Sequence, residues 1–392
     1  MAPAPFTGRD LISRLAVYVG VTQFFFVSTW TVYVAYLPQL AEQAGIPKPW
    51  VSWILVADQL VFALTDVLTG FWLDRVRAVF ARIGGWMLGV TAISCSAFLA
   101  LPLAGASAGA LLAAIAVWAV TSAALRSPPW VLLSRHAATP AIPWLSSLVL
   151  TGTAVASALA PYLSIALRSV DPRVPFTLSS VTLLATVAGL VLAERRFSAA
   201  TRSEPQAARP MPPLALFLAL ALLALGFQVH FALNSAPRYL RFASQAELPY
   251  LMPVFWVGFN LLMFPAVRLV KRIGPNDAMA LAAASGALAA LLAVGSSGLH
   301  MLLVAQFLAG GCWGAAIVAA YTAAVALGRS GREGRFLGTL FAVLALAVAV
   351  RIAAVTGGLA QLPAISALLP WLPEAAWLLA ALLLLGARTR RR

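Results

Sequence analysis

Long apolar stretches alternate with short polar ones along most of the chain, and this alternation predicts its secondary structure. A helix needs about 20 apolar residues to cross the hydrocarbon of a bilayer, and twelve segments of the sequence satisfy that requirement. The first six lie near 15–39, 49–73, 84–103, 107–133, 143–167 and 175–193. The second six lie near 213–234, 248–270, 277–296, 299–327, 336–362 and 368–386. The pattern therefore predicts an all-α integral membrane protein with twelve transmembrane helices.

The longest polar stretch separates the two sets of six. Glu194–Pro213 carries four arginines and four prolines, which is typical of a linker. Six plus six helices around a basic linker is the hydropathy pattern of a transporter built from repeats. We therefore expect an N-terminal half at 1–193, a cytoplasmic linker at 194–213, and a C-terminal half at 214–392 that ends in a basic cytoplasmic tail.

The composition supports a membrane environment. Apolar residues make up 62% of the chain, the mean hydropathy is +0.91, and only 10% of residues are charged, against roughly 25% in soluble domains. A net charge of +15 would suggest nucleic-acid binding in a soluble protein. Because the basic residues lie between apolar runs, we interpret them as orientation signals and expect no nucleic-acid partner.

The basic residues also predict the orientation. Cytoplasmic loops carry an excess of lysine and arginine. With the N-terminus inside, only five fall outside, namely Lys48, Arg168, Arg173, Arg238 and Arg241, and nearly all the others fall inside. Both termini are therefore expected in the cytoplasm of a multi-pass protein of the plasma (inner) membrane. The two cysteines, Cys95 and Cys312, lie inside apolar runs, and no cofactor, metal site or disulfide is expected.

A basic loop follows the second predicted helix. It contains Gly70, Asp74, Arg75 and Arg77. Gly70 permits close helix contact, and Asp74 can pair with arginines or lie at a helix N-terminus. This motif could close the cytoplasmic gate, or it could be an ordinary basic loop. A glycine, three residues and then Asp-Arg resembles the signature loop of the major facilitator superfamily.

Four further patches give a finer resemblance, to the glycoside-pentoside-hexuronide:cation symporters, the family of melibiose permease. They are Asp66–Gly70, Asp74–Arg82 with Trp86, Ser127–Trp130, and Gly331–Gly334. The resemblance implies a symporter of the twelve-helix fold. The sequence departs from the family's sodium site, because Phe62 and Arg126 stand where acidic residues are usual, so we expect no sodium site.

Four charged side chains lie well inside predicted spans: Asp58, Asp66, Arg126 and Arg351. Such charges are expensive in hydrocarbon and are expected to face the bundle interior. Asp66 and Arg126 both lie roughly 12 Å from the inner ends of their helices, which favours a pair. Asp58 and Arg351 lie about 24 and 22 Å from theirs. A second pair could join the halves when the outer side closes, or be a static pair.

Aromatic and polar residues within the spans suggest a substrate site. Gln23, Phe26, Trp30 and Tyr33 share one face of the first helix, as substrate contacts or as simple packing. His230 and Asn234 share a face of the seventh helix, and His230 could carry a proton or be a neutral buried side chain. Asn260 and Trp130 complete the candidate set.

These features favour a non-enzymatic secondary transporter. We expect a monomer that moves a small organic solute by alternating access, within membrane lipid and with proton coupling through Asp66, Asp58 or His230. A lipid or lysolipid transporter, or a drug or metabolite exporter, of the same fold remains open. An intramembrane lipid-modifying enzyme is the alternative of another class, but His136, His230 and His300 lie in separate segments.

Overall fold

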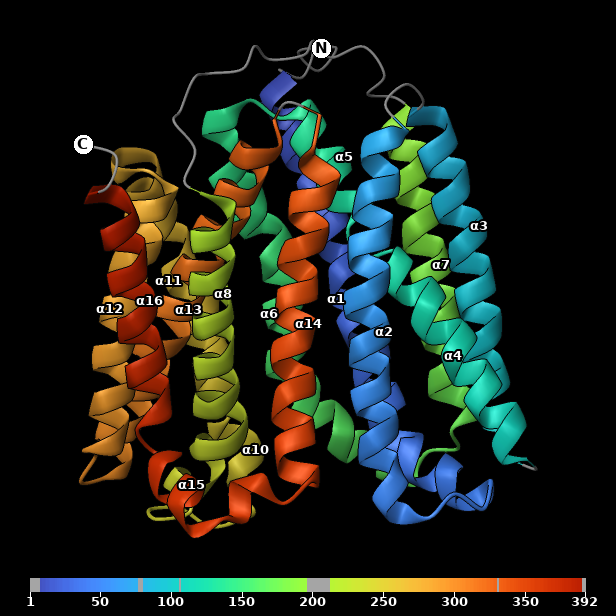
Figure 1. Ribbon diagram of the computed structural model, residues 1–392. Coiled ribbons are helices and arrows are strands. Elements are labelled where there is room, and N and C mark those ends of the chain that lie inside the picture. The colour runs from blue at the N-terminus through green and yellow to red at the C-terminus, as the bar shows by residue number, and fades with distance from the viewer. Residues whose placement is uncertain (1–7, 77–79, 106, 196–211, 330, 390–392) are drawn as a thin grey trace, which may run out of the picture.

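The computed structural model describes residues 8–76, 80–105, 107–195, 212–329 and 331–389. These residues form a bundle of roughly parallel and antiparallel helices, and no strand occurs among them (Figure 1). Eleven of their helical stretches are long and apolar enough to cross a membrane. The expected all-α membrane fold is confirmed.

The N-terminal part of the bundle contains seven α-helices. They are α1 (Gly8–Gln43), α2 (Lys48–Arg75), α3 (Phe80–Ala100), α4 (Ala108–Ala124), α5 (Pro128–His136), α6 (Ile142–Ala166) and α7 (Arg173–Arg195). Short 3-10 turns, η1 (Leu101–Leu103), η2 (Thr139–Ala141) and η3 (Leu167–Ser169), lie between or after them.

The C-terminal part begins with a composite helix. It consists of α8 (Pro213–Phe227), a π-helical segment η4 (Gln228–Asn234) and α9 (Ser235–Tyr239). The remaining elements are α10 (Leu248–Leu251), α11 (Pro253–Ile273), α12 (Pro275–Val294), α13 (Leu299–Gly328), α14 (Glu333–Thr356), η5 (Leu359–Gln361), α15 (Pro363–Leu368) and α16 (Leu372–Thr389).

Two predicted spans end or break where the backbone chemistry demands it. The span expected at 107–133 is divided into α4 and α5, because Pro128 and Pro129 lack the N–H groups that an uninterrupted helix needs. The span expected at 336–362 ends at Thr356, where Gly357 follows and Gly358 adopts a left-handed φ of 76°. Such a conformation is readily adopted only by glycine.

The twelfth predicted segment corresponds to α16, which packs along α8 and α12. Its Trp377 is buried and donates an Nε1 hydrogen bond of 2.9 Å to the carbonyl of Leu223 in α8. Gly226 and Gly286 leave the space that the indole occupies, since a Cβ at either position would overlap the ring. At the other end of α16, Arg388 forms an ion pair of 3.0 Å with Asp277 of α12.

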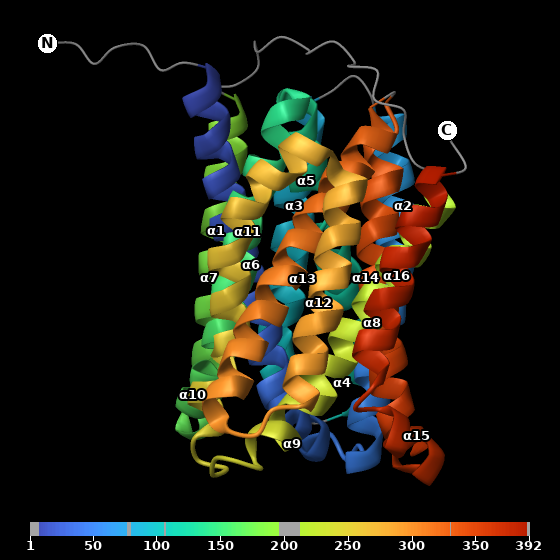
Figure 2. The same ribbon diagram turned by 90° about the vertical axis from the view of Figure 1, so that its left-hand side faces the viewer.

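Both described ends of the chain lie at the same end of the bundle, which we call the terminal end. The start of α1 and the end of α16 lie there together with α5, whereas α10 and α15 lie at the opposite end (Figure 1). The view turned by 90° shows the same arrangement, with α9, α10 and α15 gathered at the opposite end (Figure 2). Helix α2 packs along α14 and helix α6 along α11, so elements far apart in sequence form the centre of the molecule.

Candidate functional site

Helices α2 and α14 approach each other closely enough for their backbones to touch. A Cβ added at Gly70 of α2 would overlap the carbonyl of Gly334 in α14, and one added at Gly338 would overlap the carbonyl of Asp66. Small residues allow such close approach between membrane helices. The glycine expected to permit close helix contact therefore does so, and its partner is α14.

Asp74 joins the same two helices at the terminal end. Its carboxylate accepts hydrogen bonds of 2.7 Å from the backbone N–H of Gly334 and 3.0 Å from that of Arg335. The Nε of Arg335 lies 3.3 Å from the same carboxylate. These two amides belong to the first turn of α14, where N–H groups have no partner within the helix and a negative charge is stabilised.

The other members of the basic loop contribute less to this contact. Arg75 is exposed at the end of α2 and has no hydrogen bond or ion pair among the described residues. Arg77 lies outside the described residues. From α5, Arg135 donates a 2.9 Å hydrogen bond to the carbonyl of Leu73, in the last turn of α2.

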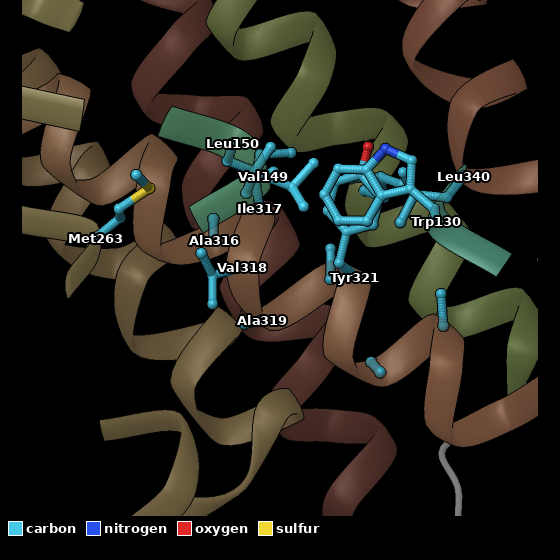
Figure 3. Packing of buried hydrophobic residues seen from close by; sticks show 14 of the residues in the cluster. Trp130, Val149, Leu150, Met263, Ala316, Ile317, Val318, Ala319, Tyr321 and Leu340 are labelled. Atoms are coloured by element: carbon cyan, nitrogen blue, oxygen red, sulfur yellow. The ribbon is translucent and has the colours of Figure 1, made fainter. Parts of the chain in front are cut away.

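An aromatic stack joins α5 to α13 nearby. Trp130 and Tyr321 lie with their ring centroids 4.0 Å apart and their planes 8° apart, and Phe341 of α14 meets Trp130 edge-on. Figure 3 shows the indole of Trp130 lying over Tyr321 among the buried residues. Trp130 was a candidate substrate contact, but its side chain is buried in this stack.

Asp66 and Arg126 are adjacent, at the depth where the sequence placed both. Arg126 Nη1 lies 3.1 Å from Asp66 Oδ2, and the carboxylate is completely buried while the arginine is 20% exposed. The guanidinium also lies 5.4 Å from the ring centroid of Phe62 in α2 and 5.2 Å from that of Phe341 in α14. Arg126 thus contacts helices from both parts of the chain.

We call these contacts together the terminal-end closure. It consists of Phe62, Asp66, Gly70 and Asp74 of α2, Arg126 and Trp130 after α4, Tyr321 of α13, and Gly334, Arg335, Gly338 and Phe341 of α14.

The expected pair of Asp58 with Arg351 is absent from this structure. Asp58 is buried and accepts a 2.7 Å hydrogen bond from the hydroxyl of Tyr33 in α1. Arg351 instead donates its Nε to Oε1 of Gln228, at 2.9 Å. A static pair is therefore not found, whereas a pair that forms when the outer side closes stays a prediction, because depth along two helices does not fix the direction in which their side chains point.

The four residues expected to share one face of the first helix differ in their surroundings: some are packed in the interior and others are partly exposed. Tyr33 is buried, and Trp118 of α4 lies 4.5 Å from it and 6.0 Å from Trp30, centroid to centroid. Trp30 and Phe26 remain half-buried, whereas Gln23 is buried. Tyr33 is therefore part of the packing between α1, α2 and α4.

His230 and Asn234 hold the C-terminal part of the bundle together. His230 is fully buried, and its Nε2 lies 3.1 Å from Oε1 of Gln306 in α13. Asn234 donates a 2.8 Å hydrogen bond to the carbonyl of Leu369 before α16. Asn260 donates to the carbonyl of Trp256 in its own helix at 3.1 Å, and its Oδ1 is buried with no partner among the described residues.

Sequence comparison identifies the family to which the chain belongs. The chain matches the Major Facilitator Superfamily over residues 19–350 and belongs to that family. Comparison with curated proteins gives no sequence match.

Solved structures of other transporters share the fold. The human organic anion transporter MFSD10 (TETRAN) is 17% identical with a TM-score of 0.74, covering 95% of this chain and 99% of that chain. A bacterial homologue of the iron transporter ferroportin, in its outward-facing state, is 14% identical with a TM-score of 0.74, covering 96% of this chain and 100% of that chain. The transporter FucP in its outward conformation is 12% identical with a TM-score of 0.67, covering 97% of this chain and 99% of that chain. At these identities the likeness establishes the fold.

Proposed function

We propose that this protein is a secondary active transporter that moves a small organic solute across the membrane by alternating access. The observation that carries the proposal is the contact of Asp74 with the first turn of α14, because it joins the two parts of the chain at the terminal end. A contact made of hydrogen bonds and glycine packing can open and re-form, as alternating access requires.

The proposed moving parts are residues 1–193 and 214–392, joined by the linker at 194–213. The excess of basic residues supports placing the terminal end, with both termini, in the cytoplasm of the plasma (inner) membrane. In that orientation the structure corresponds to a state closed toward the cytoplasm. Two of the similar structures are described as outward-facing or outward, which agrees with this assignment.

Proton coupling through Asp66 is part of the proposal. When Asp66 is ionised, it compensates the charge of Arg126, which also lies between the rings of Phe62 and Phe341. Protonation would remove that compensation and weaken the terminal-end closure. One of the similar structures is named a fucose:proton symporter, so the fold is compatible with such coupling.

The test uses the full-length protein reconstituted in proteoliposomes. We expect uptake of at least one compound from a panel of sugars, organic acids, drugs and lysolipids, with stimulation by an inward proton gradient and loss with a protonophore. Uptake that ignores the proton gradient but requires sodium would refute proton coupling. Movement of lysolipid alone would favour the lipid-transport alternative.

A conformational measurement tests alternating access without any solute. Spin labels placed at the two ends of α2 and α14 should report distances that change in opposite directions between two populations. A single fixed distance at both ends under all pH and solute conditions would contradict the transport mechanism.

A further inference from the structure

Arg351 carries a charge that no acidic side chain compensates. Among the described residues, no carboxylate lies within ion-pairing distance of it. Within the described part of the chain its one hydrogen bond joins Nε to Oε1 of Gln228, a neutral acceptor. This distinguishes it from Arg126, whose charge is paired with Asp66.

The two Nη atoms of Arg351 are accessible. Neither has a hydrogen-bond partner among the described residues, and neither is among the fully buried polar atoms that lack one. The end of the guanidinium formed by the two Nη groups, which can present two N–H groups to an oxyanion in a fixed fork, is therefore unoccupied by the described protein groups.

The bond to Gln228 directs Arg351 toward the composite helix. Arg351 is half-buried on α14, and its Nε donates to Oε1 of Gln228, the first residue of η4. The guanidinium therefore lies between α14 and the composite helix.

The partner segment has an irregular backbone. Gln228 begins the π-helical segment η4, and two aromatic rings flank it, those of Phe227 and Phe231, stacked 5.8 Å apart. Phe231 also meets Trp256 of α11 edge-on at 5.4 Å. π-Helical turns occur frequently at functional sites, and the aromatic rings next to Gln228 in the chain offer apolar surface that suits an amphipathic anion.

We infer that the fork of Arg351, positioned by Gln228, binds the anionic group of the transported solute, so that the substrate is an organic anion bearing a carboxylate, sulfonate or phosphate. The inference rests on the transport function proposed above and specifies its substrate class. A neutral Gln228 holds the guanidinium in place without competing for its charge, which an acidic residue at the same position would do.

The experiment measures ligand binding by thermal stabilisation of the full-length protein in phosphatidylcholine nanodiscs. The probes are matched pairs of anion and neutral analogue: benzoate and benzamide, benzenesulfonate and benzenesulfonamide, gluconate and glucose. We expect stabilisation by at least one anion and little by its neutral counterpart.

Three variants locate the effect. Arg351→Gln should weaken anion binding by about ten- to a hundredfold, the loss expected for a charged hydrogen bond, and Arg351→Lys should retain part of it. Gln228→Glu, which is nearly isosteric, should have a similar effect because it supplies Arg351 with an internal carboxylate while keeping the protein folded. Arg241→Gln removes a charge from an exposed position and should leave binding unchanged.

Four outcomes would overturn the inference. The first is absence of anion-dependent stabilisation across the panel, and the second is equal stabilisation by the neutral analogues. The third is anion binding that survives both Arg351→Gln and Gln228→Glu. The fourth is stabilisation only in a second set of nanodiscs that contain phosphatidylglycerol, which would assign the site to a lipid headgroup. In each case the spin-label distances decide separately whether the protein alternates between two states, so failure of the anion site is distinguishable from failure of the transport function.

Discussion

Arg126 illustrates how one side chain can join structural and functional roles. Its guanidinium meets a buried carboxylate on α2 and aromatic rings from α2 and α14. A cation over an aromatic ring contributes about 0.5–2 kcal/mol, and removal of one partner from a buried ion pair costs about 3–5 kcal/mol. Asp66 is completely buried while Arg126 is partly accessible, so the carboxylate depends more on the pair.

The first prediction concerns this pair. Arg126→Gln leaves Asp66 uncompensated and should lower the melting temperature more than the double variant Asp66→Asn/Arg126→Gln does. Thermal unfolding of the four proteins in one detergent measures the coupling. Additive effects of the two substitutions would show that the pair contributes no coupling energy.

The second prediction concerns Asp74. Asp74→Asn keeps the size of the side chain but loses its charge at the N-terminus of α14. The loss of about 1–2 kcal/mol should increase the population open at the terminal end by roughly five- to thirtyfold. The rate of thiol labelling at Ser134→Cys, a buried position beside the closure, reports this population in a protein whose two native cysteines are replaced by alanine. An unchanged labelling rate would contradict the role given to Asp74.

At the scale of elements, the contact between α2 and α14 is set by glycine spacing. Gly70, Gly334 and Gly338 bring backbone against backbone, and a side chain at any of them would meet a main-chain carbonyl that cannot move aside. Overpacked positions of this kind cost about 1–3 kcal/mol or more. Under the proposed alternating access only the state closed at the terminal end contains the contact, so a larger residue should destabilise that state selectively.

The third prediction follows from this asymmetry. Gly338→Val should favour the state open at the terminal end and raise the rate of thiol labelling at Ser134→Cys. The stability of the state closed at the opposite end should change little. Gly89→Val in α3 is the matched control, because nothing lies within 4 Å of a Cβ added there. If both variants behaved alike, helix propensity rather than steric overlap would be the cause.

Hydropathy predicted the elements well because the bilayer imposes a length on each of them, but it could not predict irregularities within them. The break before Pro128 was visible as a proline pair, whereas the π-helical segment at Gln228–Asn234 leaves no comparable mark in the sequence. Asp74 at a helix N-terminus was among the predicted possibilities. Its partner helix was not identified, since that depends on contacts between residues about 260 positions apart.

The candidate site was predicted less completely than the fold, for a physical reason. Equal depth identified Asp66 and Arg126 as neighbours, but Asp58 and Arg351 each bind a neutral side chain instead, Tyr33 and Gln228. Depth along the helix fixes how far a side chain lies from the membrane surface, and the rotation of the helix about its axis fixes the direction in which the side chain points. Gln228 could have been found as a strongly polar residue in an otherwise apolar span. The resemblance to the melibiose permease family stays a prediction.

At the scale of the whole molecule, the orientation yields the fourth prediction. In a background without native cysteines, Ser203→Cys in the linker should react with a membrane-impermeant thiol reagent only after permeabilisation of the cells. Ser244→Cys, exposed at the opposite end of the bundle, should react without it. Reaction of the linker cysteine in intact cells would invert the proposed topology and place the terminal end outside.

The bond between Asp74 and α14 has a consequence for how the sequence can vary. The shortest hydrogen bonds of the Asp74 carboxylate come from two main-chain amides, which every residue except proline provides. The side chain at position 335 can therefore be exchanged with only partial loss, while the carboxylate at position 74 has no substitute. We therefore expect unequal constraint on the two helices: α2 must keep the acid at position 74 and the glycine at position 70, whereas α14 must keep a regular first turn and its small residues.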